Sequence, residues 1–278
     1  AGADPEARVF VESYRQTSNF VGYSLDTGEK IWGPTTYDWD SFQYYGSASG
    51  GTLPLVSLGY CAYDKLFVPG YGGEIVAFDI KTGNVEWVYN NTYSGFNTVY
   101  GHYPIQIGSI ADGKIYAHTS EHSPDAPPYK GALIRCINAT DGEEIWTISG
   151  WNTFTPYGSN LVEPTYIADG YATFLNVYDM QIYTIGKGPS QITVSAPDLA
   201  AQLGQSLVIK GSVTDFAAGT KQNEQAARFP NGVAAVSDES MSAWMEYVYM
   251  QKPKPTDVTG VTVELFVIDA NNNYRSIG

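Results

Sequence analysis

The sequence predicts an all-β protein that begins with repeated four-stranded antiparallel sheets and continues into a second β-rich domain. Three observations lead to this fold class. Short segments alternate apolar and polar residues, a tryptophan recurs about every 55 to 60 residues, and a glycine lies four residues before each of these tryptophans. The 278 residues include 29 Gly and 15 Pro, and 43% are hydrophobic, which fits a buried core crossed by many turns.

Each copy of the repeat reads as a strand, a glycine turn and a second strand that carries the tryptophan. The paired positions are Gly28 and Trp32, Gly83 and Trp87, and Gly142 and Trp146. Glycine supplies the positive φ that a tight turn needs. We expect each tryptophan to pack against a neighbouring unit, covering a sheet face that one unit cannot bury alone.

A second turn signal keeps a similar period, in "AYDKLFV" (62–68), "ADGKIYA" (111–117) and "ADGYATF" (168–174). The third unit then reads as four strands, at 105–111, 114–119, 132–138 and 143–148. The first unit lacks an innermost strand, and the fourth ends near Ile185 without an outer strand or a tryptophan. The pattern in residues 1–187 therefore predicts a partial β-propeller of about four blades, with the first and last incomplete.

The strand–turn–Trp units resemble the tryptophan-docking repeats of the pyrroloquinoline quinone (PQQ)-type β-propellers, over roughly residues 8–187. The stretch "SEHSPDAPPYKG" (120–131) is similar to segments of an archaeal surface group within that family. The resemblance implies an extracellular or cell-surface location. In the enzymes of the family, PQQ lies on the axis of a complete ring beside calcium, often under a vicinal disulfide. This sequence has no Cys-Cys pair and no matching ligand set, so we expect no cofactor, unless a longer parent chain is a quinoprotein.

The pattern changes after residue 187. "QITVSAPD", "QSLVIKGSVTD" and "GVTVELFVIDANNNYRSIG" resemble the opening strands of an immunoglobulin-like β-sandwich, incomplete within 188–278. A helical insertion is expected near 237–251, with Ser237 or Asp238 as its N-cap and Pro253 beyond its end. One stripe of this helix favours core packing over a partner groove, and it consists of Met241, Trp244, Met245 and Val248.

Charge and cysteine content narrow the function classes. A formal net charge of −14 repels phosphate backbones, so we expect no nucleic-acid partner. No apolar run approaches the length of a membrane span, and the first residues resemble a mature or cut end. The two cysteines, Cys61 and Cys136, either form one disulfide or are two small buried side chains.

Three aromatic segments, 37–51, 89–104 and 151–160, connect one blade to the next. Such residues stack on sugars, form a protein interface, or fill the gaps between blades. The candidate stacking residues are Trp39, Tyr44, Tyr45, Tyr93, Trp151 and Tyr157. Two N-glycosylation sequons begin at Asn90 and Asn138, of which the second lies at the edge of a recurring turn.

Three motifs favour plain structural explanations over catalytic ones. "HTSEH" (118–122) matches an inverted zinc-protease motif, but it follows a strand and runs into prolines, whereas that chemistry needs a helix. We therefore expect a pair of loop histidines. "DTG" (26–28) matches an aspartic-protease triplet, but its acid does not recur in the aligned turns. "DANNN" (269–273) begins like a calcium loop but has Tyr274 where the loop needs glycine, so we expect a hairpin turn.

The sequence therefore favours a non-enzymatic scaffold or adhesion protein at the cell surface or outside the cell, with protein or glycan partners. We expect either a fragment of a larger chain or a subunit of an assembly, in which unpaired strands are completed by neighbours. Two alternatives stay open. One is a quinoprotein-like oxidoreductase whose catalytic blades lie outside this sequence, and the other is a carbohydrate-binding module that uses the aromatic loops.

Overall fold

A computed structural model describes residues 2–14, 19–35, 37, 59–70, 73–93, 102–103, 105–119, 132–150, 165–176 and 178–278. The chain divides into two compact units, Ala1–Gly186 and Lys187–Gly278. This division lies one residue before the domain boundary that the sequence predicts.

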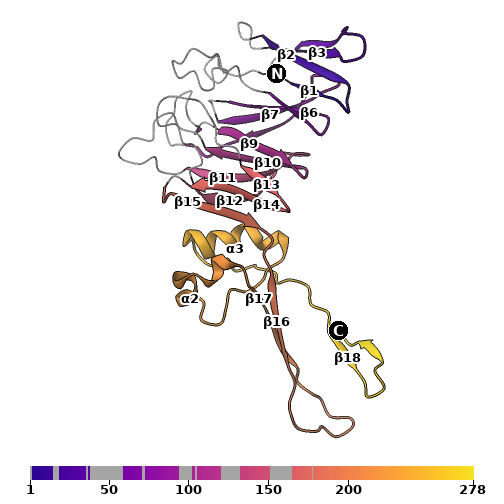
Figure 1. The fold of residues 1–278 in the computed structure, drawn as a ribbon, viewed down its shortest axis with the longest axis vertical. Helices are drawn as coiled ribbons and strands as arrows, with labels where there is room; N and C mark the ends of the chain where they lie inside the picture. Colours follow the sequence, from indigo (N-terminus) through magenta and orange to yellow (C-terminus); the bar gives the residue numbers. More distant parts are fainter. Residues whose placement is uncertain are drawn as a thin grey trace. The chain divides into compact units, whose positions relative to one another are not determined.

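The first unit is a stack of antiparallel sheets that follow one another in chain order (Figure 1). The first sheet holds β1 (Ala3–Asp4), β2 (Val9–Tyr14), β3 (Asn19–Ser24) and β4 (Lys30–Thr35). The second holds β5 (Tyr60–Ala62), β6 (Lys65–Pro69), β7 (Glu74–Asp79) and β8 (Val85–Asn90). The third holds β9 (Ile105–Ala111), β10 (Lys114–Thr119), β11 (Leu133–Asn138) and β12 (Glu144–Ser149). The fourth has β13 (Tyr166–Ala168), β14 (Tyr171–Asn176) and β15 (Gln181–Gly186).

This arrangement confirms the all-β class and the four-stranded units, and it corrects one expectation. The first sheet does not lack its innermost strand, because β1 pairs with β2 through Ala3 and Phe10 and through Asp4 and Val9. A two-residue strand is too short to show an alternating pattern, which is why the sequence does not reveal it. The fourth sheet ends at its third strand, as expected from the absence of a fourth tryptophan repeat.

The recurring glycine turns share one geometry. Gly28, Gly83 and Gly142 have φ values of 73°, 74° and 77°, a region that side chains with a Cβ rarely adopt. The residue four positions earlier is Ser24, Asp79 or Asn138, and its carbonyl accepts the glycine N–H at 2.8–2.9 Å. Its side-chain oxygen also accepts backbone N–H groups inside the turn, at 2.7–3.2 Å. A polar residue and a glycine thus define each turn.

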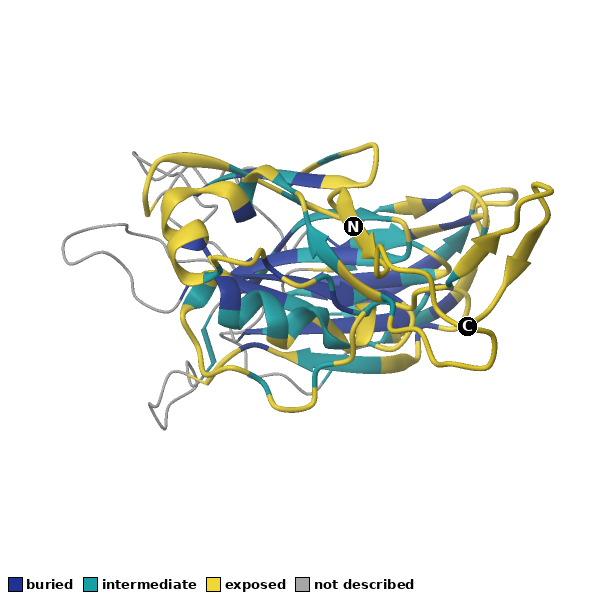
Figure 2. Ribbon diagram, turned by 90° about the horizontal axis from the view of Figure 1, so that it is seen from below, coloured by how far each residue is buried: buried dark blue, intermediate teal, exposed yellow. Residues whose placement is uncertain are grey.

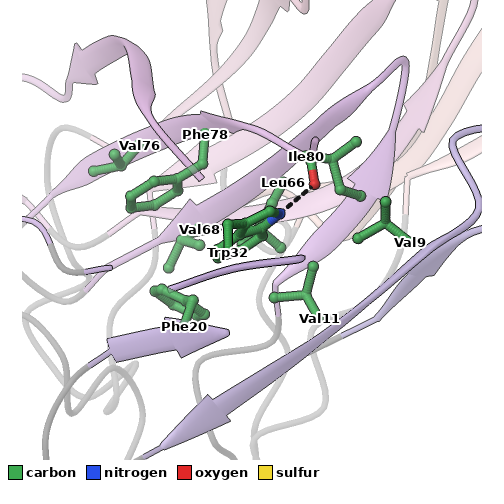
Figure 3. Packing of buried hydrophobic residues seen from close by; sticks show 9 residues of the cluster. All are labelled: Val9, Val11, Phe20, Trp32, Leu66, Val68, Val76, Phe78 and Ile80. Carbon is green, nitrogen blue, oxygen red and sulfur yellow. Dashed lines mark hydrogen bonds between the residues drawn. The ribbon is translucent and has the colours of Figure 1, made fainter. Parts of the chain in front are cut away.

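Two clusters of buried residues lie between neighbouring sheets of this unit. The first joins the first and second sheets, and Figure 3 shows its members: Val9, Val11, Phe20, Trp32, Leu66, Val68, Val76, Phe78 and Ile80. The second joins the second and third sheets, and it contains Phe67, Ile75, Ala77, Ile105, Ile107, Ile115, Ala117, Ile137 and Ala139. Alternate residues of β6 and β7 enter different clusters, so both faces of these strands are buried. Figure 2 colours each residue by its burial, and much of the dark blue of buried residues lies on strands.

The second unit contains two separate hairpins and a helical region. The hairpins pair β16 (Ser190–Ser195) with β17 (Lys210–Asp215), and β18 (Phe266–Ile268) with β19 (Tyr274–Ser276). These two sheets are not joined, and every residue of β16 and β18 is exposed. The strands are found where the sequence predicts them, but they do not form two packed sheets. The immunoglobulin-like sandwich therefore stays a prediction.

Between the hairpins lie η1 (Ala218–Lys221), α2 (Asn223–Arg228) and α3 (Asp238–Met250). Ser237 is the N-cap of α3, and Gln251, with a φ of 55°, ends the helix before Pro253. Of the predicted apolar stripe, only Val248 is fully buried, while the other three side chains are half-buried. The Arg228 guanidinium donates to the carbonyl of Val248 at 2.6 Å, which fastens α2 to α3.

Candidate functional site

The tryptophan of one sheet docks on the glycine turn of the next. A Cβ placed on Gly83 would lie 2.4 Å from Cε3 of Trp32, and one on Gly142 would lie 2.6 Å from Cε3 of Trp87. Trp32 is 7% exposed, and its Nε1 donates to the carbonyl of Ile80 at 2.7 Å (Figure 3). These glycines are therefore needed twice, for the positive φ of the turn and for the space that the indole ring occupies.

The three tryptophans are not equivalent. Trp87 is half-buried, and its Nε1 has no hydrogen-bond partner among the described residues. Trp146 is also half-buried, and its ring lies 6.2 Å from that of Tyr116 on its own sheet. None of the described glycines has Trp146 among the nearest atoms to its would-be Cβ. Within the described part of the chain, Trp32 and Trp87 thus each dock on a glycine turn, whereas Trp146 does not.

The connections that carry the aromatic residues share one end of the sheets. Because successive strands run antiparallel, the glycine turns lie at one end of each sheet, and the connections to the next sheet leave from the other end. The three predicted aromatic loops therefore begin at the same end. Most candidate stacking residues lie outside the described residues, namely Trp39, Tyr44, Tyr45, Trp151 and Tyr157.

Tyr93 is the candidate stacking residue that the structure describes, and it is 52% exposed. It forms an isolated antiparallel bridge with His102, and the two rings meet edge to face with centroids 5.5 Å apart. Nδ1 of His102 donates to the carbonyl of Asn91 at 2.5 Å, and Nδ2 of Asn91 donates to the carbonyl of Tyr103 at 2.7 Å. The base of this loop is thereby held in place, with one aromatic ring facing solvent.

Beneath this loop lies a buried cation that the sequence-based candidates do not include. Arg135, on β11, is 2% exposed. Its Nη1 donates to Oγ1 of Thr119 at 2.9 Å, and its Nη2 donates to Oγ1 of Thr92 at 2.5 Å. Its Nε lies 3.4 Å from the carboxylate of Glu144, which also accepts the hydroxyl of Tyr89 at 2.6 Å. We call Arg135, Glu144, Tyr89, Thr92 and Thr119 the arginine cluster.

The arginine cluster joins two sheets. Tyr89 and Thr92 belong to the second sheet and its exit, whereas Arg135, Glu144 and Thr119 belong to the third. Burial raises the pKa of the Tyr89 hydroxyl, as does its hydrogen bond to Glu144, while the charge of Arg135 acts in the opposite direction. One signal in the sequence could have identified the cluster. "LIRCIN" places a charge in the middle of a strand that is buried on both faces, and a buried charge requires partners.

His118 belongs to the "HTSEH" motif and lies on β10, so the segment is not helical there, but the expectation of a loop histidine is wrong for His118 because the strand continues through it. The imidazole is fully buried, and neither ring nitrogen has a hydrogen-bond partner among the described residues. Burial lowers the pKa of His118 to about 4. His122 lies outside the described residues.

Both cysteines are free thiols, so of the two alternatives the disulfide is wrong. Cys136 is buried on β11 and Cys61 is half-buried on β5. Burial raises the pKa of Cys61 to about 11 and that of Cys136 to about 12. Neither thiol is activated as a nucleophile.

The two sequons differ in geometry. Asn90 is exposed at the end of β8. Asn138 is half-buried, its Oδ1 accepts the N–H of Thr140 at 2.9 Å, and its Nδ2 donates to Asp141 at 3.1 Å. The side-chain amide of Asn138 is thus a part of the turn, whereas that of Asn90 faces solvent.

The other two motifs are turns, as expected. Asp26 of "DTG" is exposed in the first glycine turn and forms an ion pair with Arg8. Oδ1 of Asp269 in "DANNN" accepts the N–H groups of Asn271 and Asn273 at 2.8 and 2.9 Å. These hydrogen bonds lower the pKa of Asp269, the largest effect coming from the side chain of Asn273.

The described residues do not fit a PQQ–calcium site. Such a site requires several carboxylate and amide oxygens that converge on one cation. Two of the buried or partly buried carboxylates have other roles here, because Oδ1 of Asp4 accepts two backbone N–H groups at 2.9 Å and Glu144 belongs to the arginine cluster. Within the described ranges, no three His, Cys, Asp or Glu side chains are grouped as metal ligands. No helix in that part of the chain is long and apolar enough to cross a membrane.

No protein-family model and no curated protein matches this chain. Among solved structures, BamB from Moraxella catarrhalis matches 66% of the chain with a TM-score of 0.39 and 13% identity. A quinohemoprotein alcohol dehydrogenase from Comamonas testosteroni matches 52% with a TM-score of 0.37 and 19% identity. A europium-containing methanol dehydrogenase matches 60% with a TM-score of 0.35 and 13% identity. The chain spans 51%, 20% and 30% of these proteins, respectively, and the likeness concerns the fold alone.

Proposed function

We propose that this chain is a non-enzymatic scaffold or adhesion protein that acts outside the cell or at the cell surface and binds protein or glycan partners. The arginine cluster carries this proposal. Its charged and polar groups bond to one another across two sheets, so the buried Arg135 fastens the second sheet to the third instead of facing a substrate. Catalytic groups, in contrast, need a free face within reach of the reacting atoms.

The enzymatic alternative predicts a different outcome in a direct assay. The full chain is mixed with PQQ and CaCl₂, and reduction of an artificial electron-acceptor dye is followed with primary alcohols as substrates. We expect no dye reduction above a protein-free control. Alcohol-dependent reduction that a chelator abolishes would replace the scaffold function with the quinoprotein one.

Carbohydrate binding is the second candidate, and Tyr93 favours it. Its ring is exposed on an anchored loop base beside an imidazole, an arrangement suited to stacking on a sugar face. A glycan array should give a signal with the native chain that falls at least tenfold with Tyr93→Ala. Val85→Ala is the matched control, because Val85 is 40% exposed and lies at the opposite end of the strand that leads into this loop. An equal signal from Tyr93→Ala and Val85→Ala would remove Tyr93 from the site.

A further inference from the structure

Building on the scaffold function proposed above, we propose that the free edge of β15 binds an extended segment of a partner protein. This segment carries a glycine four residues ahead of a tryptophan. It occupies, in the fourth sheet, the position that the outer strand holds in the other three. The glycine and the tryptophan of the partner segment are inferred from the spacing of these two residues in the repeats of this chain.

The first observation concerns strand pairing. β3, β7 and β11 are the third strands of their sheets, and each pairs with an outer strand that follows a glycine turn. β15 is the corresponding third strand, and among the described residues it pairs with β14 alone. An unpaired strand edge presents backbone N–H and C=O groups that readily accept another strand.

The second observation concerns exposure. On β7 and β11, the equivalent third strands, the central apolar side chains are at most 1% exposed, including Ile75 and Ile137. On β15, Ile182 is 73% exposed, and Gln181 and Thr184 are also exposed. Residues 187–278 are all described, and none of them pairs with β15. Within the described ranges, this edge of β15 is therefore open to a further strand.

The third observation comes from the docking series. Trp32 rests on Gly83 and Trp87 on Gly142, so each tryptophan meets the glycine turn of the following sheet. Trp146 is the next tryptophan in the series, and the glycine turn that it would meet joins the third and outer strands of the fourth sheet. A partner segment on β15 with a glycine at that turn supplies the missing contact.

The same segment extends the series by one further step. Its own tryptophan, four residues after the glycine, would face the glycine turn of a following sheet. The turn at Gly28 has nearly the same φ as the occupied ones, yet no described residue lies within 4 Å of its would-be Cβ. Among the described residues, the turn at Gly28 is thus empty and Trp146 is undocked, and one Gly-x-x-x-Trp strand has the chemistry that both require.

The test uses a fluorescein-labelled synthetic peptide with the sequence of residues 79–90, DIKTGNVEWVYN, titrated with the full chain and followed by fluorescence anisotropy. We expect saturable binding that weakens at least tenfold when the peptide tryptophan becomes Ala or the peptide glycine becomes Val. Hydrogen exchange should show added protection at the amides of Gln181–Gly186. In the chain, Trp146→Ala should weaken binding about as much, and Val85→Ala, an exposed position on another outer strand, should leave it unchanged.

Three results would overturn this inference: an absence of binding, binding that is indifferent to the peptide tryptophan and glycine, or added protection outside β15. A chain that sediments as a dimer without peptide, and as a monomer with it, would assign the edge to a second copy instead of a partner protein. These failures are separate from failure of the scaffold function. Alcohol-dependent dye reduction would remove the scaffold function without affecting peptide binding at β15.

Discussion

The contact between Trp32 and Gly83 allows the cost of a single added methyl group to be separated into two parts. In Gly83→Ala, the new Cβ must adopt a φ near 74° and must also displace the Trp32 ring, from which it would lie only 2.4 Å away. In Gly28→Ala, the φ near 73° is the same and nothing lies within 4 Å. The chain therefore contains its own control for the conformational part of the effect.

The left-handed conformation costs a residue with a Cβ about 1–2 kcal/mol, and this should be the full effect of Gly28→Ala. Carbon atoms in contact prefer a separation of about 3.5–4.0 Å, so Trp32 must move by about 1 Å in Gly83→Ala. Overpacking of this kind costs a further ~1–3 kcal/mol. We therefore expect Gly83→Ala to lower the free energy of unfolding by about 2–5 kcal/mol.

Urea-induced unfolding, followed by circular dichroism, measures both variants, and equal m values ensure that only stability has changed. The same pair is then measured in a Trp32→Leu background, which removes the ring atoms that the new Cβ would meet. The difference between the two alanine variants should disappear there. Equal costs in the native background, or a difference that persists once the indole ring is gone, would refute the docking explanation.

Three further predictions concern buried groups. Arg135→Lys should cost about 2–3 kcal/mol in urea unfolding, because one ammonium group cannot replace the hydrogen bonds to two threonines and the contact with Glu144; a loss below about 0.5 kcal/mol would mean that the arginine cluster is not stabilising. Since the pKa of His118 is lowered in the folded chain to about 4 from its ordinary 6.5, the unfolded chain binds the extra proton as pH falls from 6.5 to 4, and stability should decline across that window. His118→Leu should flatten this decline, and an unchanged slope would contradict it. Denatured but unreduced protein should take up two iodoacetamide adducts, at Cys61 and Cys136, whereas a disulfide would give none.

The repeats were predictable because their signals are local. A glycine turn needs a positive φ, and a strand with one or two buried faces needs a matching apolar pattern, so the strands of the third sheet are found where the sequence places them. The turn at Tyr63 and Asp64 shows where this reasoning weakens, because both adopt positive φ without any glycine. The position of this turn can be predicted only because it aligns with the Asp-Gly turns of the later repeats.

Features that depend on distant contacts were not predictable. β1 is two residues long, and its pairing with β2 leaves no pattern in the sequence. The arginine cluster requires Thr92 and Arg135 to meet across a sheet interface, which the spacing of these residues does not reveal. In the second unit, the alternating pattern predicts the two hairpins, but it does not predict whether their sheets pack against one another. The exposure of the candidate stacking residues could not be predicted for a similar reason, because a loop has no periodic pattern that indicates which of its aromatic side chains face solvent.

The interleaved side chains of β6 and β7 have a consequence for how such a chain could arise. The even-numbered residues of each of these strands pack against one neighbouring sheet, and the odd-numbered residues pack against the other. The second sheet therefore has an apolar surface on both of its faces. A duplicated gene segment encoding one turn-to-turn unit would therefore insert into the stack without requiring new complementary mutations. Gain or loss of a whole unit would keep every interface matched, whereas a substitution at one of these buried positions must be accommodated by the neighbouring sheet that it contacts.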